Sequence, residues 1–272
     1  MTDPGNTAAR ATPARIERPS ALAFLGYGAA LLVILWSFRG AGWSGERLMH
    51  APPALADFMT RSWPPATDAL GRLGLKMIET LQIAVAGAAL GVVLSLPIAL
   101  LAARGLIAGR AVNTAVRVML GVMRAVPDIA WALVFVVAVG LGPFAGMLAI
   151  VVDTIGFCGR FFADDMEAAD KGPAEALTAT GARRLDIAAS ATIPASIPAF
   201  ISTSLYALEK AVRSSTILGL VGAGGIGIEL KVAFDLFDYP TAMTVIGMIA
   251  VVVIVVEQLG IYARKKIIGV ER

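Results

Sequence analysis

The sequence predicts an all-α protein that crosses a membrane about six times. Three observations predict this fold class. Of the 272 residues, 57% are hydrophobic and only 16% are charged, whereas soluble domains average about 25% charged residues. The mean hydropathy is high, at +0.77. Finally, six apolar stretches reach or approach the length of about 20 residues that a helix needs to cross the hydrocarbon core.

The six predicted spans divide the chain into a core and its extensions. The spans cover residues 21–38, 81–103, 119–141, 144 to just beyond 158, 199–220 and 241–262. The first is long for the core of a signal peptide and leads straight into Arg39, which favours an uncleaved helix over a signal peptide. The predicted segments are a tail (1–20), the first span (21–38), an outer loop (39–76), a core membrane domain (77–263) and a second tail (264–272).

Two local patterns add detail to these spans. Lys and Arg are more frequent in the segments that lie on the same side of the membrane as the N-terminus. The positive-inside rule therefore predicts that both termini are cytoplasmic. In the second span, Gly87 and Gly91 form a GxxxG pattern. This pattern indicates either close approach of two helix backbones or a chance match in a glycine-rich chain.

The composition excludes several function classes. The chain has one cysteine and one histidine, Cys158 and His50, and a net charge of +3. One cysteine forms no disulfide framework, and a lone histidine leaves little for a metal site or a catalytic dyad. The positive charge is too small to argue for nucleic acid. No GxxxxGK[ST] loop is present, so the chain is not expected to hydrolyse ATP by itself.

The segment from Arg160 to Pro198 is the longest cytoplasmic loop in this topology. Gly172 and Pro173 read as a helix start, since proline suits the first turn. Thr180 and Gly181 read as its end, since glycine accepts the left-handed conformation. A second helix is expected over 182–192, before Pro194, and Pro198 is expected to open the fifth span. A helix–turn–helix of this kind could dock on a soluble partner, although it could also be an ordinary connection.

The same loop carries a family resemblance. Glu175-Ala176-Leu177, then Gly181, then Ile193-Pro194 resemble the EAA loop of bacterial ABC importer permeases, with Glu, Gly and Pro at the family spacing. The resemblance implies the type I ABC importer permease fold and a coupling helix that contacts an ATP-binding subunit. Glu175, Ala176, Gly181 and Pro194 are the implied ATPase-coupling residues.

The resemblance also implies partners and a location. It implies two ATP-binding subunits, which hold the ATP and Mg, while this chain binds no cofactor. It further implies a second permease copy or homologue, an extracytoplasmic substrate-binding protein, and the bacterial inner membrane. The chain would then be a transport subunit and not an enzyme.

Further motifs resemble the phosphonate-importer branch of this family. They lie between Met77 and the C-terminus and include Arg124-Ala125-Val126-Pro127-Asp128, Arg213-Ser214-Ser215-Thr216 and Gly222-Ala223-Gly224-Gly225-Ile226-Gly227. The resemblance implies import of a phosphonate, with phosphite, hypophosphite, another oxyanion or another small solute as alternatives. The last motif also fits the dinucleotide fingerprint GxGxxG. That fingerprint needs a βαβ unit, which these apolar surroundings do not predict, so a close-packed outer turn is expected instead.

Charged residues in the fifth span suggest a translocation pathway. Glu209 and Arg213 are four residues apart and can pair on one helix face. Ser214, Ser215 and Thr216 add hydroxyl groups. One hypothesis is that Arg213 and these hydroxyls line an anion path, with Glu209 holding Arg213 until substrate arrives. The alternative is a structural ion pair that fixes helix packing.

Two other function classes remain as alternatives. Asp164-Asp165 is compatible with a membrane-embedded lipid-modifying enzyme of the prenyltransferase kind, but no second acidic cluster is present. A solvated part of the cytoplasmic loop is the preferred interpretation of this pair. A channel or membrane scaffold is the other alternative. Copurification with an ATPase would separate the transporter from both.

Overall fold

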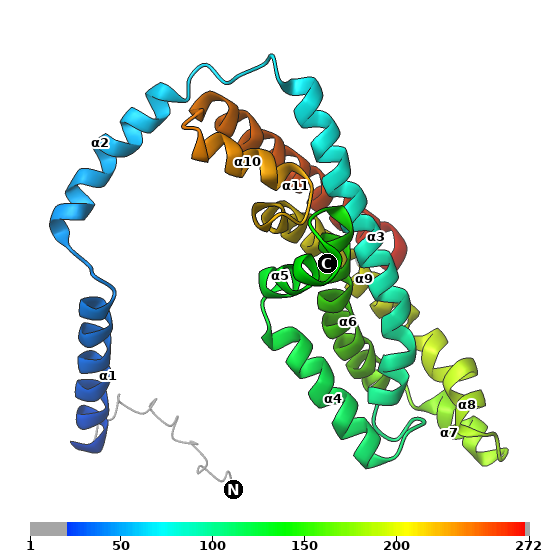
Figure 1. Cartoon of the computed structure of the whole chain (residues 1–272). Coiled ribbons are helices and arrows are strands. Elements are labelled where there is room, and N and C mark those ends of the chain that lie inside the picture. The colour runs from blue at the N-terminus through cyan, green and yellow to red at the C-terminus, as the bar shows by residue number, and fades with distance from the viewer. Residues whose placement is uncertain (1–20, 270–272) are drawn as a thin grey trace, which may run out of the picture. The chain divides into compact units, whose positions relative to one another are not determined.

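The computed structural model describes residues 21–269, and every regular element in that range is a helix (Figure 1). The predicted tail 1–20 and residues 270–272 of the second tail lie outside the described residues. The chain forms two units, Met1–Asp57 and Phe58–Arg272. Each unit is described separately below.

The first unit contains α1 (Ala21–Gly40) and most of α2 (Gly45–Arg61). At 1.5 Å per residue, the 20 residues of α1 extend about 30 Å, which is enough to cross a bilayer. This helix agrees with the predicted first span, and none of the residues from Leu22 to Gly40 is buried. The start of α2 is capped by Ser44, whose Oγ accepts a hydrogen bond from the Arg47 amide at 3.1 Å.

The centre of the second unit consists of α3 (Leu70–Ala102), α6 (Pro143–Ala168) and α9 (Ile193–Leu218). The GxxxG pattern is a true interface, because Gly87 and Gly91 of α3 lie directly on α6. A Cβ on Gly91 would lie 2.5 Å from the Cβ of Thr154, and one on Gly87 would lie 2.8 Å from the Cβ of Ile150. Only glycine therefore permits this approach of the two backbones.

The predicted span over 119–141 is a broken element in the structure. It consists of α4 (Arg110–Ala125) and α5 (Asp128–Val139), which meet at 91°. Val126 is extended, with ψ of 123°, because the ring of the following proline disfavours the helical region for the residue before it. The chain resumes a helix at Asp128, directly after Pro127. With this bent pair counted as one span, the described residues hold up to six candidate spans.

The cytoplasmic loop of the sequence analysis is shorter in the structure. The end of α6 extends to Ala168, so Asp164 and Asp165 lie in its last turns and not in the loop. Then α7 (Gly172–Ala179) begins and ends close to the predicted positions. Gly181 has φ of +81°, the left-handed conformation expected of a helix-terminating glycine.

The second predicted helix of this loop does not stop before Pro194. It comprises α8 (Arg184–Ile187) and a π-helical turn (Ala188–Thr192), and it runs directly into α9. Pro194 is the second residue of α9, which directly follows the π-helical turn. Pro198 lies inside α9 and does not open it. The combined element, Arg184–Val221, is 38 residues long.

The C-terminal part returns to the other end of this unit. A 3₁₀ turn (Gly219–Val221) and a glycine turn lead to α10 (Ile226–Asp235) and α11 (Tyr239–Ile268). The glycine turn packs tightly on α6, since a Cβ on Gly224 would lie 2.8 Å from the Cα of Pro143. The Ile226 amide donates to Thr80 Oγ1 of α3 at 2.7 Å. The expected close-packed turn is confirmed, and no strand precedes it in the described chain.

Candidate functional site

The first candidate site is the helix α7, which projects from the end of the second unit. Figure 1 shows α7 and α8 at the end where α3 leads into α4. Glu175, Ala176 and Gly181 are all exposed, and α7 buries none of its residues in this chain. Its C-terminus is closed by its own backbone, since the Gly181 amide donates to the Thr178 carbonyl at 3.0 Å. The helix is thus locally complete but has a free outer face.

An ion-pair network lies at the end of α6, shortly before α7 in the chain. The guanidinium of Arg117, from α4, pairs with Asp164 at 3.2 Å and with Glu167. Its Nε also donates to the Ala102 carbonyl at the end of α3, at 2.8 Å. Arg160 supplies a second cation to Asp164 at 2.9 Å. These contacts join the ends of α3, α4 and α6 to one another. Asp164 thus serves as an ion-pair partner of two arginines, which accounts for this carboxylate without a metal or a catalytic role.

A second candidate site is a polar cluster inside the helices of the second unit. Lys210 of α9 donates to both carboxylate oxygens of Asp153 of α6, at 2.6 and 2.8 Å. One turn further along α9, Ser214 Oγ donates to Asp128 of α5 at 2.5 Å. Asp128 and Asp153 are also close enough to interact electrostatically. Three helices thus share one charged cluster in an otherwise apolar environment, where ionised groups are costly unless paired.

The predicted pair between Glu209 and Arg213 is wrong. Glu209 pairs instead with Arg264 of α11, with Oε1 and NH1 2.8 Å apart. Gly260 lies directly against this carboxylate, and a Cβ at this position would overlap with Glu209 Oε1. Spacing along one helix allowed the predicted pair, but it contained no information about the cation that α11 brings to the same place.

Arg213 is exposed and has no carboxylate within ion-pair distance among the residues described. Of the three hydroxyls predicted beside it, two are used by α9 itself. Ser215 donates to the Val212 carbonyl at 2.8 Å, and Thr216 donates to the Arg213 carbonyl at 2.7 Å. Ser214 alone reaches another helix. An unpaired guanidinium therefore remains on the face of α9 that also carries Lys210.

Aromatic rings continue this face toward α4. Lys210 Nζ lies 5.6 Å from the centre of the Phe157 ring, and Arg124 lies 5.6 Å from the centre of the Phe161 ring. The two rings are 4.7 Å apart, and Tyr206 lies 5.6 Å from Phe157. Cations over ring faces gain electrostatic attraction. The arrangement is a row of cations and aromatic rings that crosses α4, α6 and α9.

The pairing of Lys210 with Asp153, and of Arg264 with Glu209, was not predicted from the sequence. The signal for Asp153 was present, because a lone carboxylate in an apolar span requires a partner or a watery path. Neither Lys210 nor Arg264 could be assigned to a partner from the sequence, because each pairs with a residue more than 50 positions away along the chain.

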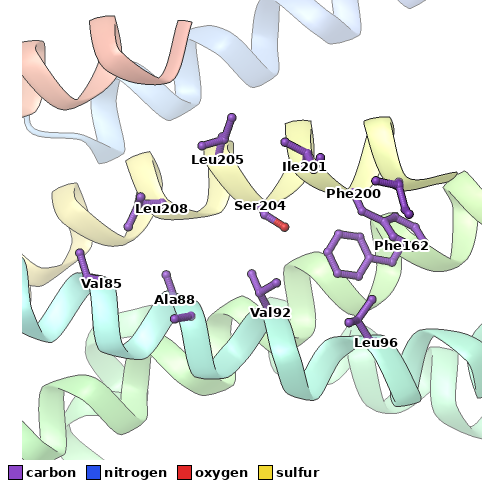
Figure 2. A pocket seen from close by; sticks show the side chains of 12 residues that line it. Val85, Ala88, Val92, Leu96, Phe162, Phe200, Ile201, Ser204, Leu205 and Leu208 are labelled. Atoms are coloured by element: carbon purple, nitrogen blue, oxygen red, sulfur yellow. The ribbon is translucent and has the colours of Figure 1, made fainter. Parts of the chain in front are cut away.

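The apolar groove between α3 and α9 does not fit a charged solute. It encloses about 400 Å³, and Ser204 supplies its only polar side chain. Figure 2 shows Val85, Ala88, Val92 and Leu96 of α3 facing Ile201, Leu205 and Leu208 of α9, with Phe162 and Phe200 at one end. Ser204 and Arg213 are nine residues, or two and a half turns, apart, so they project from opposite sides of α9.

Known proteins with related sequences are transport permeases. Residues 95–263 match the family described as the inner membrane component of binding-protein-dependent transport systems. The phosphite transport permease PtxC of Stutzerimonas stutzeri is 34% identical over 218 residues, which cover 80% of this chain and 79% of PtxC. The phosphate-import permease PhnE of Mycolicibacterium smegmatis is 36% identical over 228 residues, 81% of this chain. This match spans only 43% of PhnE.

Solved structures place the fold in the same group. A chain of the MetNI methionine ABC transporter, in an inward-facing conformation, superposes with a TM-score of 0.65 at 22% identity. The match covers 74% of this chain and 99% of that one. The predicted all-α importer permease fold and the predicted family are therefore confirmed. This chain belongs to the family of binding-protein-dependent transport system inner membrane components.

Proposed function

We propose that this permease is the membrane subunit of an ATP-driven importer that moves a phosphonate or a related phosphorus oxyanion into the cell. Relatives named for phosphite transport and phosphate import support this substrate class. The observation that carries the proposal is the exposed guanidinium of Arg213, which pairs with no described carboxylate and lies on the face of α9 that also carries Lys210. A guanidinium presents a planar fork of donors that matches the oxygens of a phosphorus oxyanion.

The coupling proposal rests on α7. Its exposed face, with Glu175, Ala176 and Gly181, would contact a cleft in an ATP-binding subunit. Two such subunits would act on two permeases, either two copies of this chain or this chain and a homologue. ATP and Mg would be bound in those subunits and not in this chain. An extracytoplasmic binding protein would deliver the substrate, with both termini of this chain in the cytoplasm.

The continuity of α8, the π-turn and α9 suggests how a movement driven by ATP hydrolysis would reach the substrate path. Arg184 and Arg213 belong to one element, and the 29 residue steps between them span about 44 Å at 1.5 Å per residue. Motion applied to α7 and α8 is therefore delivered to the helix that carries Lys210 and Arg213. The ion pairs around Arg117 keep the ends of α4 and α6 fixed as the pivot. The cation face of each permease would then turn from one side of the membrane to the other.

The test of coupling uses the transporter reconstituted from this permease, its ATP-binding subunits and its binding protein. The double variant Glu175→Gln and Gly181→Val is expected to lose substrate-stimulated ATP hydrolysis and uptake while the permease still reaches the membrane. A matched control is Asp186→Asn, which removes an exposed carboxylate from the neighbouring helix α8. Unchanged coupling in the double variant would mean that α7 is not the contact with the ATPase.

A further inference from the structure

A cleft at the α7 end of the second unit has the properties of an anion site. It encloses about 540 Å³ and lies between the α3–α4 connection, the start of α4 and α8. Sites for small molecules typically enclose about 300–1,000 Å³. Three arginines line it: Arg104 from the connection, Arg110 from the first turn of α4, and Arg184 from the first turn of α8. No Asp or Glu lines it.

None of these three arginine side chains forms an ion pair with a described carboxylate, although the Arg104 backbone amide donates to Glu167 Oε1 at 2.6 Å. Arg117 and Arg160, at the nearby end of α6, both pair with carboxylates. In contrast, no described carboxylate lies within ion-pair distance of Arg104, Arg110 or Arg184. Three guanidiniums around one cleft repel each other, and a bound anion relieves that repulsion. The cleft therefore favours a ligand with several acceptor oxygens and a negative charge.

The start of α4 adds donors of a second kind. Gly109 precedes this helix and offers no side chain to cap it, and the first turn of α4 contains no acidic residue. The free amides of that turn and the positive end of the helix dipole both favour an anion at this position. The cleft thus combines backbone donors with three arginine side chains.

Asn113 makes this geometry a built feature. Its side chain is buried, and Nδ2 donates to the Leu101 carbonyl at 2.6 Å and the Ala103 carbonyl at 3.2 Å. These bonds tie the first turn of α4 to the end of α3. Arg104 and Arg110 are therefore held on opposite sides of one fixed corner, and Arg184 approaches from the separate helix α8.

We propose that this cleft binds a phosphate group, and that the bound phosphate ties α8 to the α3–α4 corner. Two sources share this chemistry: a free phosphorus oxyanion in the cytoplasm, or the headgroup phosphate of an anionic lipid. The cleft lies next to the end of the candidate span α3 (Leu70–Ala102), and basic pockets at the ends of spans can bind lipid headgroups. Because α8 continues into α9, a phosphate bound in the cleft would restrain the movement of the whole element Arg184–Val221. The site is separate from the transport path, and its test does not depend on the proposed substrate.

The experiment measures binding to the full-length permease in nanodiscs. In discs of phosphatidylcholine alone, titration calorimetry with inorganic phosphate reports a free-anion site. In mixed discs that contain phosphatidylglycerol, native mass spectrometry reports lipids that stay bound. The double variant Arg110→Gln and Arg184→Gln is expected to weaken binding from whichever source by about tenfold or more, since each lost charge-assisted contact costs roughly that factor.

The matched control removes the same charge from outside the cleft. Arg183→Gln with Lys265→Gln alters two exposed cations that do not line it, and this variant is expected to bind as the wild type does. Binding of phosphate alone would identify a free anion as the ligand, and retention of phosphatidylglycerol alone would identify a lipid. The proposal is overturned if neither ligand binds, if the cleft variant binds as tightly as the wild type, or if the control loses as much affinity as the cleft variant.

Discussion

The ion pair between Lys210 and Asp153 offers a quantitative test of the membrane cluster. The variant Lys210→Met removes both hydrogen bonds, at 2.6 and 2.8 Å, and leaves Asp153 beside Asp128 without a cation. Removing one partner of a fully buried pair costs about 3–5 kcal/mol. The side chain of Asp153 is 11% exposed, but that of Lys210 is 34% exposed. Solvent therefore screens part of the interaction, and we expect a loss of about 2–3 kcal/mol.

The reverse variant, Asp153→Asn, should cost less. Lys210 would keep its exposure to solvent and its position over the Phe157 ring. A cation over a ring in a partly exposed site retains about 0.5–1 kcal/mol of attraction. We therefore expect Asp153→Asn to lose about 1 kcal/mol, well below the loss in Lys210→Met. The double variant should recover stability, because no charge is then left unpaired.

The assay is thermal unfolding of the full-length permease in one detergent, followed by the loss of the monodisperse peak in size-exclusion chromatography. One kcal/mol shifts the midpoint of a chain of this size class by about 2–4 °C, so Lys210→Met should unfold about 4–12 °C below the wild type. Arg213→Met is the matched control, because it removes an exposed cation from the same helix that has no ion-pair partner. If the double variant lost as much as the two single variants combined, Lys210 and Asp153 would not be coupled.

Three further outcomes are expected. Gly91→Val should separate α3 from α6, since even a Cβ would lie 2.5 Å from the Cβ of Thr154. This overpacking should cost about 1–3 kcal/mol and lower the unfolding midpoint. The control Gly121→Val, at which a Cβ meets no neighbour, should change the midpoint less. Arg117→Met should lower the same midpoint by several degrees, because its side chain is only 9% exposed and bridges three helices. Arg213→Ala should reduce uptake at normal membrane levels by about tenfold, with partial activity in Arg213→Lys, because lysine keeps the charge but not the planar fork; full uptake in Arg213→Ala would exclude this residue from the path.

Much of the fold was predictable, because membrane helices are selected by length and hydropathy, which a sequence displays directly. The end of α7 was equally accessible, since Gly181 provides the left-handed position that terminates a helix. The start of α3 was not. It begins at Leu70, 11 residues before the predicted position 81, because Leu73 and Met77 pack with Ile226 of α10 and Val245 of α11. That stabilisation comes from distant residues and leaves no local pattern.

The candidate site was also predictable only in part. The unusual residues of α9 were recognisable, since charges in an apolar span are rare and costly. Their partners were not, because Arg264 and Asp153 reach them across helix contacts that only the folded chain defines. The break in the span predicted over 119–141 was not foreseen, because the 91° between α4 and α5 depends on what each of the two helices packs against.

The π-turn before Pro194 sets the side of the α9 axis toward which α7 projects. In this turn the Ile193 amide reaches the Ala188 carbonyl, five residues back, so one extra residue is wound into the element. Proline has no amide, and in a regular helix its ring would collide with the carbonyl four residues earlier. The wider turn provides the space that this ring needs. Without the proline, the turn could tighten into a regular helix, and everything before it would swing around the axis of α9 by about 100°, the angle of one residue. In the proposed coupling, Pro194 would therefore act from a distance, by setting the side of α9 toward which Glu175 projects.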